Sequence, residues 1–230
     1  MAIEIFPVTG LPDIEPGDDL PALLVTVVAP LHPRASDILV VTHKVVSKAE
    51  GAIAPAPSEE DYRKVVAAEA TSIVRRRGEM VIAVTRHGFV CANAGVDRSN
   101  VTDDRVVLLP RDPDRSAHRI RTRLQRDLGV DLAVVISDTF GRAWRTGVVD
   151  VAIGLSGMKP ILDLKGTTDM HGRPLEVTEV AIADEVAAAA ELAMGKATGI
   201  AAALVRGVMF EPGNGRASEL VRNPAEDMFR

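Results

Sequence analysis

Residues 131–147 read DLAVVISDTFGRAWRTG, and the architecture of the chain follows from this segment more than from any other. Its first seven residues, DLAVVIS, contain an apolar run of five and predict a buried strand. The run leads directly into Asp138 and Thr139, so we expect a carboxylate and a hydroxyl together at the carboxyl end of the strand. Such a sheet edge is a frequent metal-binding position in α/β proteins. Gly141 is expected to let the chain turn tightly just beyond it.

Two arginines, Arg142 and Arg145, complete this segment. A guanidinium is permanently charged and can hold a phosphate or a carboxylate through two parallel hydrogen bonds. The alternative is a pair of surface arginines that neighbouring acids neutralise, which contributes little to stability. Because both arginines follow Asp138 and Thr139, we favour a role in binding an anionic substrate.

The segments around this one mix short strands with helices. Strands are expected at residues 3–7, 37–42, 80–84, 88–92, 105–110 and 200–207, with a hairpin around residues 86–88. Helices are expected at residues 18–30, starting at Asp18, at 58–77, at 113–128 and, after a strand edge, within the Ala-rich stretch 175–195. Residues 147–168 are Gly-rich with short apolar runs. The chain is therefore predicted to be a mixed α/β (α+β) protein, since the strict alternation of a doubly wound sheet is absent.

Length and composition limit the possible classes of protein. The 230 residues can form one domain over residues 1–230, or two subdomains that meet near the turn-rich residues 54–58. The net charge of −5, with Lys and Arg spread along the chain, gives no general attraction to nucleic acid. The acidic, Pro-containing N-terminus lacks the pattern of a secretory peptide, and no apolar run could span a membrane. A cytoplasmic protein without nucleic-acid or membrane partners is expected.

Cysteine and histidine usage points away from thiolate chemistry. The single cysteine, Cys91, excludes an internal disulfide and a multi-thiolate metal site within one chain, and we expect it to be a small buried apolar residue. His171, in the polar loop at residues 168–173, is interpreted as a surface histidine because the sequence identifies no partner for it. No GxxxxGK[ST] loop, no GxGxxG after a strand and no HExxH is present, so a nucleotide would have to be bound by other residues.

Three further loops are rich in residues that can bind ligands. The turn GLPDI, residues 10–14, allows its backbone to approach a flat ligand closely, although a plain surface turn has the same composition. In THKVVSKAEG, residues 42–51, Lys48 follows a strand and can donate to phosphate oxygens, whereas most lysines are only solvated. In NAGVDRSN, residues 93–100, Asp97 offers a hard oxygen for Mg²⁺ or Mn²⁺, and Asn100 offers an amide for a base or a phosphate. An Asx turn would use the same residues.

Taken in order, these motifs resemble those of the coenzyme F420-0:L-glutamate ligase family. The resemblance rests on TGLPDI, THKVVSKAEG, NAGVDRSN, DTFGRAWRTGVVDVAIG and the closing NPAEDMFR, and so runs from the first strand to the last residue. It implies an unusual mixed-sheet fold, an intertwined homodimer, and catalysis with GTP and Mn²⁺ or Mg²⁺, often with a monovalent cation such as K⁺.

The resemblance also implies roles for individual residues. It assigns metal binding to Asp97, Asp138 and Thr139. Catalytic roles are expected for Asp138, as a metal ligand, and for Arg142 and Arg145, because of their permanent charge. The residues that it assigns to the nucleotide are Leu11, Pro12, Asp13, Ile14, Lys48 and Asn100, with His43 standing where relatives commonly carry a small hydroxyl residue that touches the nucleotide. The family also uses backbone near the end of the long helix, here around residues 194–196.

The implied reaction begins when the terminal carboxylate of coenzyme F420-0 attacks the γ-phosphate of GTP. The resulting acyl phosphate is then displaced by the amine of L-glutamate, and further γ-linked glutamates can follow. Two anions meet in the first step, so a metal ion acting as Lewis acid, together with Lys48 or the arginines, fits the chemistry. Two alternatives stay open: a carboxylate-amine ligase acting on another small acid, and a nucleotide-sensing module without turnover.

Overall fold

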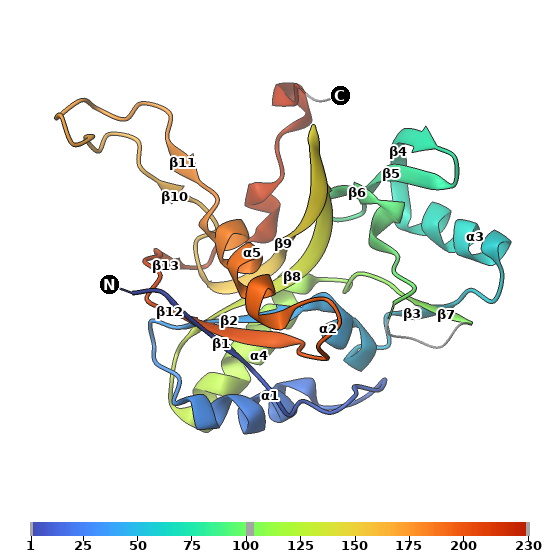
Figure 1. The fold of residues 1–230 in the computed structure, drawn as a ribbon, viewed down its shortest axis with the longest axis horizontal. Coiled ribbons are helices and arrows are strands. Elements are labelled where there is room, and N and C mark those ends of the chain that lie inside the picture. The colour runs from blue at the N-terminus through green and yellow to red at the C-terminus, as the bar shows by residue number, and fades with distance from the viewer. Residues whose placement is uncertain (1, 100–103, 229–230) are drawn as a thin grey trace.

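A six-stranded mixed sheet forms the centre of the protein (Figure 1). The computed structural model describes residues 2–99 and 104–228. In spatial order the strands are β1 (Glu4–Pro7), β12 (Ala202–Arg206), β2 (Ile38–Thr42), β8 (Ala133–Arg142), β9 (Arg145–Met158) and β13 (Pro212–Gly213). Only β2 and β8 pair in parallel, in a register that places Thr42 opposite Ser137. The side chains of β2 and of the first half of β8 are almost entirely buried, which explains their continuous apolar sequence.

Helices cover both faces of this sheet. Helix α1 (Leu20–Val28) and helix α4 (Pro113–Leu128) pack together below it in Figure 1, and α5 (Ile182–Met194) lies above it. Helix α4 begins after Asp112, whose side chain accepts from the Arg115 N–H, and ends at Gly129 in the left-handed conformation. Alanines at 183, 187 and 190 are fully buried, so α5 can approach the sheet closely.

The remaining elements form smaller units beside the sheet. Helix α2 (His43–Ala49) continues directly from β2. The other elements are η1 (Ala29–Leu31), β3 (Ile53–Pro55), α3 (Glu59–Glu69), β4 (Ala70–Arg77), β5 (Met80–Thr85), β6 (Val90–Ala92), η2 (Asn93–Gly95), β7 (Arg105–Val107), β10 (Leu162–Asp163), β11 (Glu179–Val180), η3 (Ala217–Leu220) and η4 (Pro224–Glu226). Strands β3 and β7 form one sheet and β4, β5 and β6 another, over a small apolar cluster that includes Val66, Val81 and Val106.

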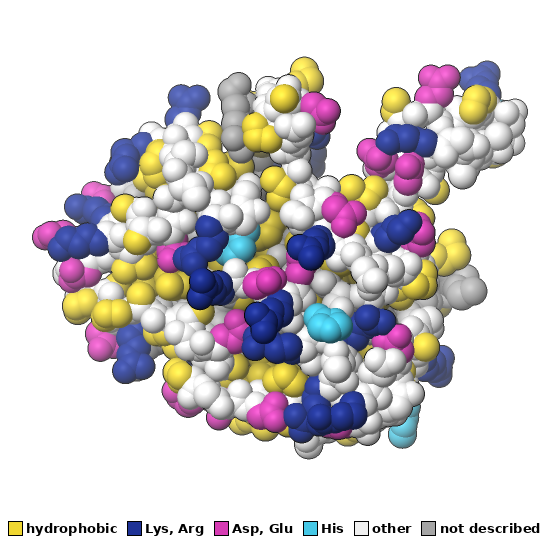
Figure 2. Space-filling view, turned by 180° about the vertical axis from the view of Figure 1, so that it is seen from behind, with side chains coloured by type: hydrophobic (Ala, Val, Ile, Leu, Met, Phe, Trp, Pro, Cys, Tyr) yellow, Lys and Arg dark blue, Asp and Glu magenta, His cyan; other side chains and the backbone are white. Residues whose placement is uncertain are grey.

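Two extended segments project from the body. In Figure 1 the hairpin of β8 and β9 extends upward beyond the sheet, and the arm that carries β10 and β11 projects to the upper left. Seen from behind in Figure 2, the arm is separate from the body and carries hydrophobic side chains among charged ones. Met170 and Val177 on this arm are 92% and 83% exposed, and Trp144 at the hairpin turn is 84% exposed.

Much of the expected secondary structure is confirmed. Helix α4 and its end at Gly129, the hairpin of β5 and β6, and the strand–helix succession of β11 and α5 all lie where the sequence predicts them. Cys91 is buried as expected, and burial raises the pKa of its thiol to about 12. The mixed α/β class is confirmed, with several sheets and a single parallel pair in the central one. No helix of the described residues is long and apolar enough to cross a membrane.

Expectations about local structure are wrong in three regions of the chain. The predicted helix at residues 58–77 ends at Glu69, and residues 70–77 form strand β4, because Thr71, Ile73 and Val74 are β-branched and favour extended backbone. Ile73, expected on a buried stripe, is 45% exposed. Helix α1 is capped by Asp19 rather than started by Asp18, since the Asp19 side chain accepts from the Ala22 N–H.

The third difference concerns the segment around residue 140. Strand β8 continues to Arg142, and Gly141 pairs with Val148 inside the hairpin instead of turning the chain. The turn falls at residues 143–144, where Trp144 takes a left-handed φ of 61°. Residues 147–158, which gave no strand signal, belong to the long strand β9, because pairing with β8 compensates for their glycines.

Candidate functional site

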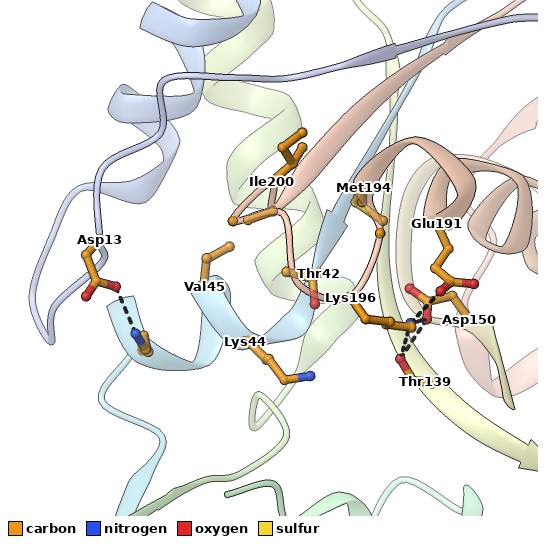
Figure 3. Close-up of a pocket in the computed structure, with 14 residues that line it drawn as sticks. Asp13, Thr42, Lys44, Val45, Thr139, Asp150, Glu191, Met194, Lys196 and Ile200 are labelled. Carbon is orange, nitrogen blue, oxygen red and sulfur yellow. Dashed lines mark hydrogen bonds and ion pairs between the residues drawn. The ribbon is translucent and has the colours of Figure 1, made fainter. Parts of the chain in front are cut away.

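A pocket lined by charged side chains opens where β2 and β8 leave the core (Figure 3). Its volume is about 160 Å³. Lysines and acids face each other across it, from α2, from the β8–β9 pair and from the end of α5. The charged residues that line it are Asp13, Lys44, Lys48, Asp150, Glu191 and Lys196. The three lysines offer ammonium donors to an anionic ligand, and the three acids of the same lining balance their charge.

The densest polar contacts of the pocket surround Lys196. Its Nζ lies 2.7 Å from Thr139 Oγ1, 2.6 Å from Asp150 Oδ1 and 3.0 Å from Glu191 Oε1. Figure 3 shows these three side chains converging on the ammonium from different elements. Burial alone would lower the pKa of Lys196, but the hydrogen bonds to Asp150 and Glu191 raise it above its ordinary value. The ammonium is therefore charged at neutral pH.

Asp150 is the buried acid of this cluster, with a side chain only 5% exposed. Its carboxylate accepts from the Ser137 hydroxyl at 3.0 Å and from the Thr139 hydroxyl at 2.7 Å. Our sequence reasoning missed Asp150, and it also missed Glu191 and Lys196 as side-chain contributors. One signal for Asp150 was available: it is the single acid within the apolar segment VVDVAIG. A buried carboxylate needs hydrogen bonds or a cation nearby, so such an acid indicates a polar cluster. Nothing in the sequence shows that residues 191 and 196 meet it.

Two more lysine–acid pairs lie on the α2 side of the pocket. Lys44 Nζ is 2.9 Å from Asp97 Oδ2, and Lys48 Nζ is 2.9 Å from Asp13 Oδ1. Burial alone would raise the pKa of Asp97, but the Lys44 ammonium and the Ser99 N–H hold it below its usual range. The hydrogen bond and the charge of Lys48 likewise lower the pKa of Asp13. These acids stay ionised and are matched one to one with cations.

Asp138 lies beside a fully buried histidine. His43 is the first residue of α2, and the parallel register of β2 and β8 brings it next to Asp138. Its Nε2 is 3.2 Å from Asp138 Oδ1, a close contact whose direction is not that of an aligned hydrogen bond, and its Nδ1 is 3.3 Å from Ser47 Oγ. The Thr139 N–H donates to the same Asp138 oxygen at 2.7 Å. This side of β8 is therefore nearly closed to water.

Asp138 and Thr139 are not side by side in the way that the sequence predicts. Successive side chains of a strand point to opposite faces, and the contacts follow this rule. Asp138 faces His43, whereas the Thr139 hydroxyl faces Asp150 and Lys196. The expected edge carrying both groups together is thus split between two faces of β8.

The other predicted site residues are dispersed. Asp13, Lys48 and Thr139 line the pocket, and Asp97 contacts the pocket residue Lys44. Of the remaining turn residues, Ile14 is buried in the main core, Leu11 packs partly against that core, and Pro12 is exposed. Arg142 and Arg145 are exposed at the hairpin tip, and Arg142 donates to the Thr146 carbonyl. Asn100 lies outside the described residues.

The predicted arginines are not among the residues that line this pocket. Arg142 is four residues beyond Asp138 on β8, a separation of roughly 13 Å at the usual rise of a strand. Within residues 2–99 and 104–228, no group of three or more His, Cys, Asp or Glu residues is arranged to hold a metal ion. The catalytic and metal-binding assignments of the individual residues stay predictions.

Comparison with known proteins decides the family. A family model described as F420-0:Gamma-glutamyl ligase matches residues 10–207. The chain belongs to this family. That membership confirms the resemblance seen in the motifs, and the matched residues include the whole cluster around Lys196.

Three relatives of the ligase family illustrate how far the similarity extends. Each carries the name Coenzyme F420:L-glutamate ligase. The protein of Methanothermobacter thermautotrophicus is 41% identical over 251 aligned positions that cover all of both chains. That of Methanopyrus kandleri is 44% identical over 249 positions, covering 99% of this chain and 98% of the relative. That of Archaeoglobus fulgidus is 41% identical over 247 positions, covering all of this chain and 97% of the relative.

Proposed function

We propose that this protein joins L-glutamate to the terminal carboxylate of coenzyme F420-0, uses GTP to do so, and releases GDP and phosphate. Membership of the ligase family and the names of the relatives support the acceptor and the bond that is formed. The observation that carries the use of a nucleotide is the pocket with Lys44, Lys48 and Lys196 on its wall. Each of these ammonium groups is paired with an acid, so a triphosphate would take the place of those acids as the acceptor of the lysine N–H groups.

The lysines have a second task in the proposed reaction. The acceptor carboxylate attacks the γ-phosphate, so two anions must approach each other before the acyl phosphate forms. Fixed positive charge at this point lowers the barrier, because it stabilises the charge that develops in the transition state. Lys44 and Lys48 approach from α2 and Lys196 from the end of α5, so they neutralise the phosphates from two sides. The amine of L-glutamate then displaces the phosphate from the acyl phosphate.

The residues present also fit a divalent cation. Asp97 contacts Lys44 and Asp138 contacts His43, and Lys44 and His43 are consecutive residues of α2. Carboxylate oxygens are the donors that Mg²⁺ and Mn²⁺ prefer. We propose that Asp97 and Asp138 hold the ion. The Thr139 hydroxyl faces Asp150 and Lys196 on the opposite face of β8 and does not join them in this arrangement. When bound, the ion would supply Lewis-acid activation of a phosphate oxygen, an effect worth several kcal/mol.

We further propose that the protein acts as a homodimer. Arg142, Arg145 and Trp144 lie at the tip of a hairpin that projects from the body, and the β10–β11 arm exposes Met170 and Val177 (Figures 1 and 2). A second copy that received the hairpin would bury this apolar surface. It could also bring the two arginines to an acceptor phosphate that they do not reach within one chain.

Incubation of the purified protein with GTP, L-glutamate, coenzyme F420-0 and Mn²⁺ tests the reaction. We expect GDP, phosphate and an acceptor whose mass has risen by one glutamyl unit, with no product when Mn²⁺ is chelated or ATP replaces GTP. If glutamate were transferred to a different small acid and not to coenzyme F420-0, the proposed acceptor would be wrong. Tight GTP binding without phosphate release in any mixture would instead identify a nucleotide sensor and end the ligase proposal.

A further inference from the structure

A second pocket lies against the β8–β9 hairpin, and its volume is about 220 Å³. Its walls come from the turn between β5 and β6, from β6, β8 and β9, from the start of α5 and from the C-terminal segment. Most of the lining side chains are apolar: Phe89, Val90, Phe140, Val151, Leu220 and Val221. None of the residues of this pocket lines the lysine-rich one, so it is a separate site.

The second pocket begins next to Asp138. Phe140 follows Asp138 by two residues on β8, and side chains two apart on a strand share a face of the sheet. Val151 is the register partner of Asp138 on β9, and residues opposite each other in an antiparallel pair have Cβ atoms about 5 Å apart. A ligand with one end at Asp138 can therefore extend along the same face of the hairpin into this pocket.

Three aromatic rings follow one another at its wall. Phe89 and Phe140 meet edge to face, with ring centroids 6.1 Å apart, and His87 stacks on Phe89 at 5.5 Å. Phe89 is only 7% exposed, so its ring is held by its neighbours. Aromatic side chains pack well against another ring, face to face with an offset or edge to face. The pocket is therefore better suited to a flat aromatic ring than to an amino acid.

One acid of the lining can orient such a ring. Asp184, in the first turn of α5, accepts from the Ala152 N–H through Oδ1 at 2.9 Å. Over residues 2–99 and 104–228, no other hydrogen bond and no cation reaches this carboxylate. Its second oxygen is available to an N–H at the edge of a ligand. A mainly apolar pocket with a few polar groups that set the orientation is typical of small-molecule sites.

The C-terminal segment closes the pocket on one side. Gly88 has a φ of +89°, and a Cβ at this position would lie 3.5 Å from Val221 Cγ1, so the segment packs directly over the β5–β6 turn. Asp227, in the closing motif NPAEDMFR, also lines the pocket, and it follows the short helix η4 that Asn223 caps. The proposed chemistry gives this motif no role, and its place at the pocket supplies one.

We propose that this second pocket binds the flat deazaflavin ring of coenzyme F420-0, with Phe89 and Phe140 against the ring and Asp184 at its polar edge. The acceptor then lies along the face of the hairpin that carries Asp138, with its terminal carboxylate at the Asp138 end. GTP approaches from the lysine-lined pocket on the other face. The inference rests on the proposed function, since it takes the acceptor to be coenzyme F420-0.

Competition with a fragment of the acceptor tests whether the ring has a site of its own. The deazaflavin nucleoside keeps the ring but lacks the phosphate and the terminal carboxylate, so it cannot react. The fluorescence of the ring reports its binding to the full chain. We expect the nucleoside to bind the wild-type protein, and to inhibit turnover competitively against coenzyme F420-0 but not against GTP.

Substitutions at the pocket wall test where the ring binds. Val90→Asp brings a charge to the wall, and Val74→Asp is its matched control, because the two valines lie on strands and are 39% and 37% exposed, while Val74 is not part of the lining. Phe140→Leu removes one ring and keeps an apolar side chain. Phe6→Leu is its control, since Phe6 is also a half-buried strand residue.

We expect the KM for coenzyme F420-0 to rise about tenfold in Val90→Asp, because a carboxylate is costly to bury under the ring. Phe140→Leu should raise the same KM about fivefold through the loss of the contact between rings. The affinity for the nucleoside should fall in parallel in both variants. The KM for GTP should not change in either variant, and neither control should alter either KM.

The inference is overturned if the nucleoside neither binds nor competes, or if a folded Val90→Asp or Phe140→Leu variant keeps the wild-type KM for coenzyme F420-0. An unchanged KM for GTP shows that a variant is folded. Val221→Asp, on the C-terminal segment, is a second charged variant for the case that Val90→Asp does not fold. Failure of the proposed function looks different. In that case the wild type makes no glutamyl product from GTP, while the nucleoside still binds and binds more weakly to Val90→Asp.

Discussion

Asp138 and Thr139 are neighbours in sequence, yet they belong to two different environments. Asp138 faces the closed side of β8, where His43 is fully buried and no described lysine contacts the carboxylate. Thr139 faces the open side, where its hydroxyl joins Asp150 and Lys196 in a charged cluster. The alternation of side chains along β8 thus separates the two neighbours. Asp138 lies against His43 without a lysine partner, and Thr139 belongs to the cluster around Lys196. The two sides should respond differently to substitution.

The largest effect is expected on the closed side. Asp138→Asn keeps the shape and an acceptor for the Thr139 N–H but removes the charge that we assign to the metal ion. Loss of that ion's contribution, several kcal/mol, corresponds to a rate reduced roughly 1000-fold or more. The rate of GDP release and the affinity for Mn²⁺ measure the outcome. Near-normal turnover by this variant would show that Asp138 does not take part in the reaction.

A smaller effect is expected on the open side. Asp150→Asn keeps an acceptor for only one of the two hydroxyls, since Ser137 donates to one carboxylate oxygen and Thr139 to the other, and it removes the charge that holds Lys196. We expect kcat to fall roughly 100-fold, as when one electrostatic partner of a transition state is displaced, with Mn²⁺ affinity nearly unchanged. If Asp150→Asn lost Mn²⁺ as completely as Asp138→Asn, the two faces would not be functionally distinct.

The lysines of α2 separate the two sides further. Lys44→Met and Lys48→Met should each raise the KM for GTP about tenfold, because each removes one charged hydrogen bond worth about 1.4 kcal/mol. Only Lys44→Met should also tighten Mn²⁺ binding in the absence of nucleotide, since Lys44 competes with the ion for Asp97. The exposed pair of Lys64 with Glu60 provides Lys64→Met as a control. Equal Mn²⁺ affinity in all three variants would contradict the assignment of Asp97.

These differences show what the sequence could and could not predict. The strand of residues 133–137, helix α4 and the family were predictable because each depends on local apolar periodicity, capping or motif order. The cluster around Lys196 was not, since Asp150, Glu191 and Lys196 meet only through tertiary packing. The sequence predicted Arg142 and Arg145 to lie just beyond a tight turn at Gly141, close to Asp138. Pairing of β8 with β9 extends the hairpin to residue 142 and carries both arginines away from the pocket.

The smallest effect concerns an acid that has no lysine partner. Burial raises the pKa of Asp184 above its ordinary value of 3.8, while the hydrogen bond from the Ala152 N–H offsets this in part. A carboxyl with a raised folded-state pKa stabilises the fold below pH 3.8 and loses that contribution as the pH rises through the folded-state pKa. Asp184→Asn should therefore stabilise the protein at pH 7, by less than about 1 kcal/mol, and the gain should vanish below pH 3.8. Thermal unfolding at several pH values checks this, and a destabilised variant at pH 7 would contradict it.

The central claim is that a nucleoside triphosphate binds in the lysine-lined pocket and that a divalent ion is held beside it by Asp97 and Asp138. A crystal structure of the protein with Mn²⁺ and GMPPNP tests it most directly, because the anomalous signal locates manganese without assumptions. We predict one manganese peak in contact with Asp97 and Asp138, and a triphosphate bound among Lys44, Lys48 and Lys196. A triphosphate elsewhere on the molecule, or manganese that touches neither acid, would contradict the account.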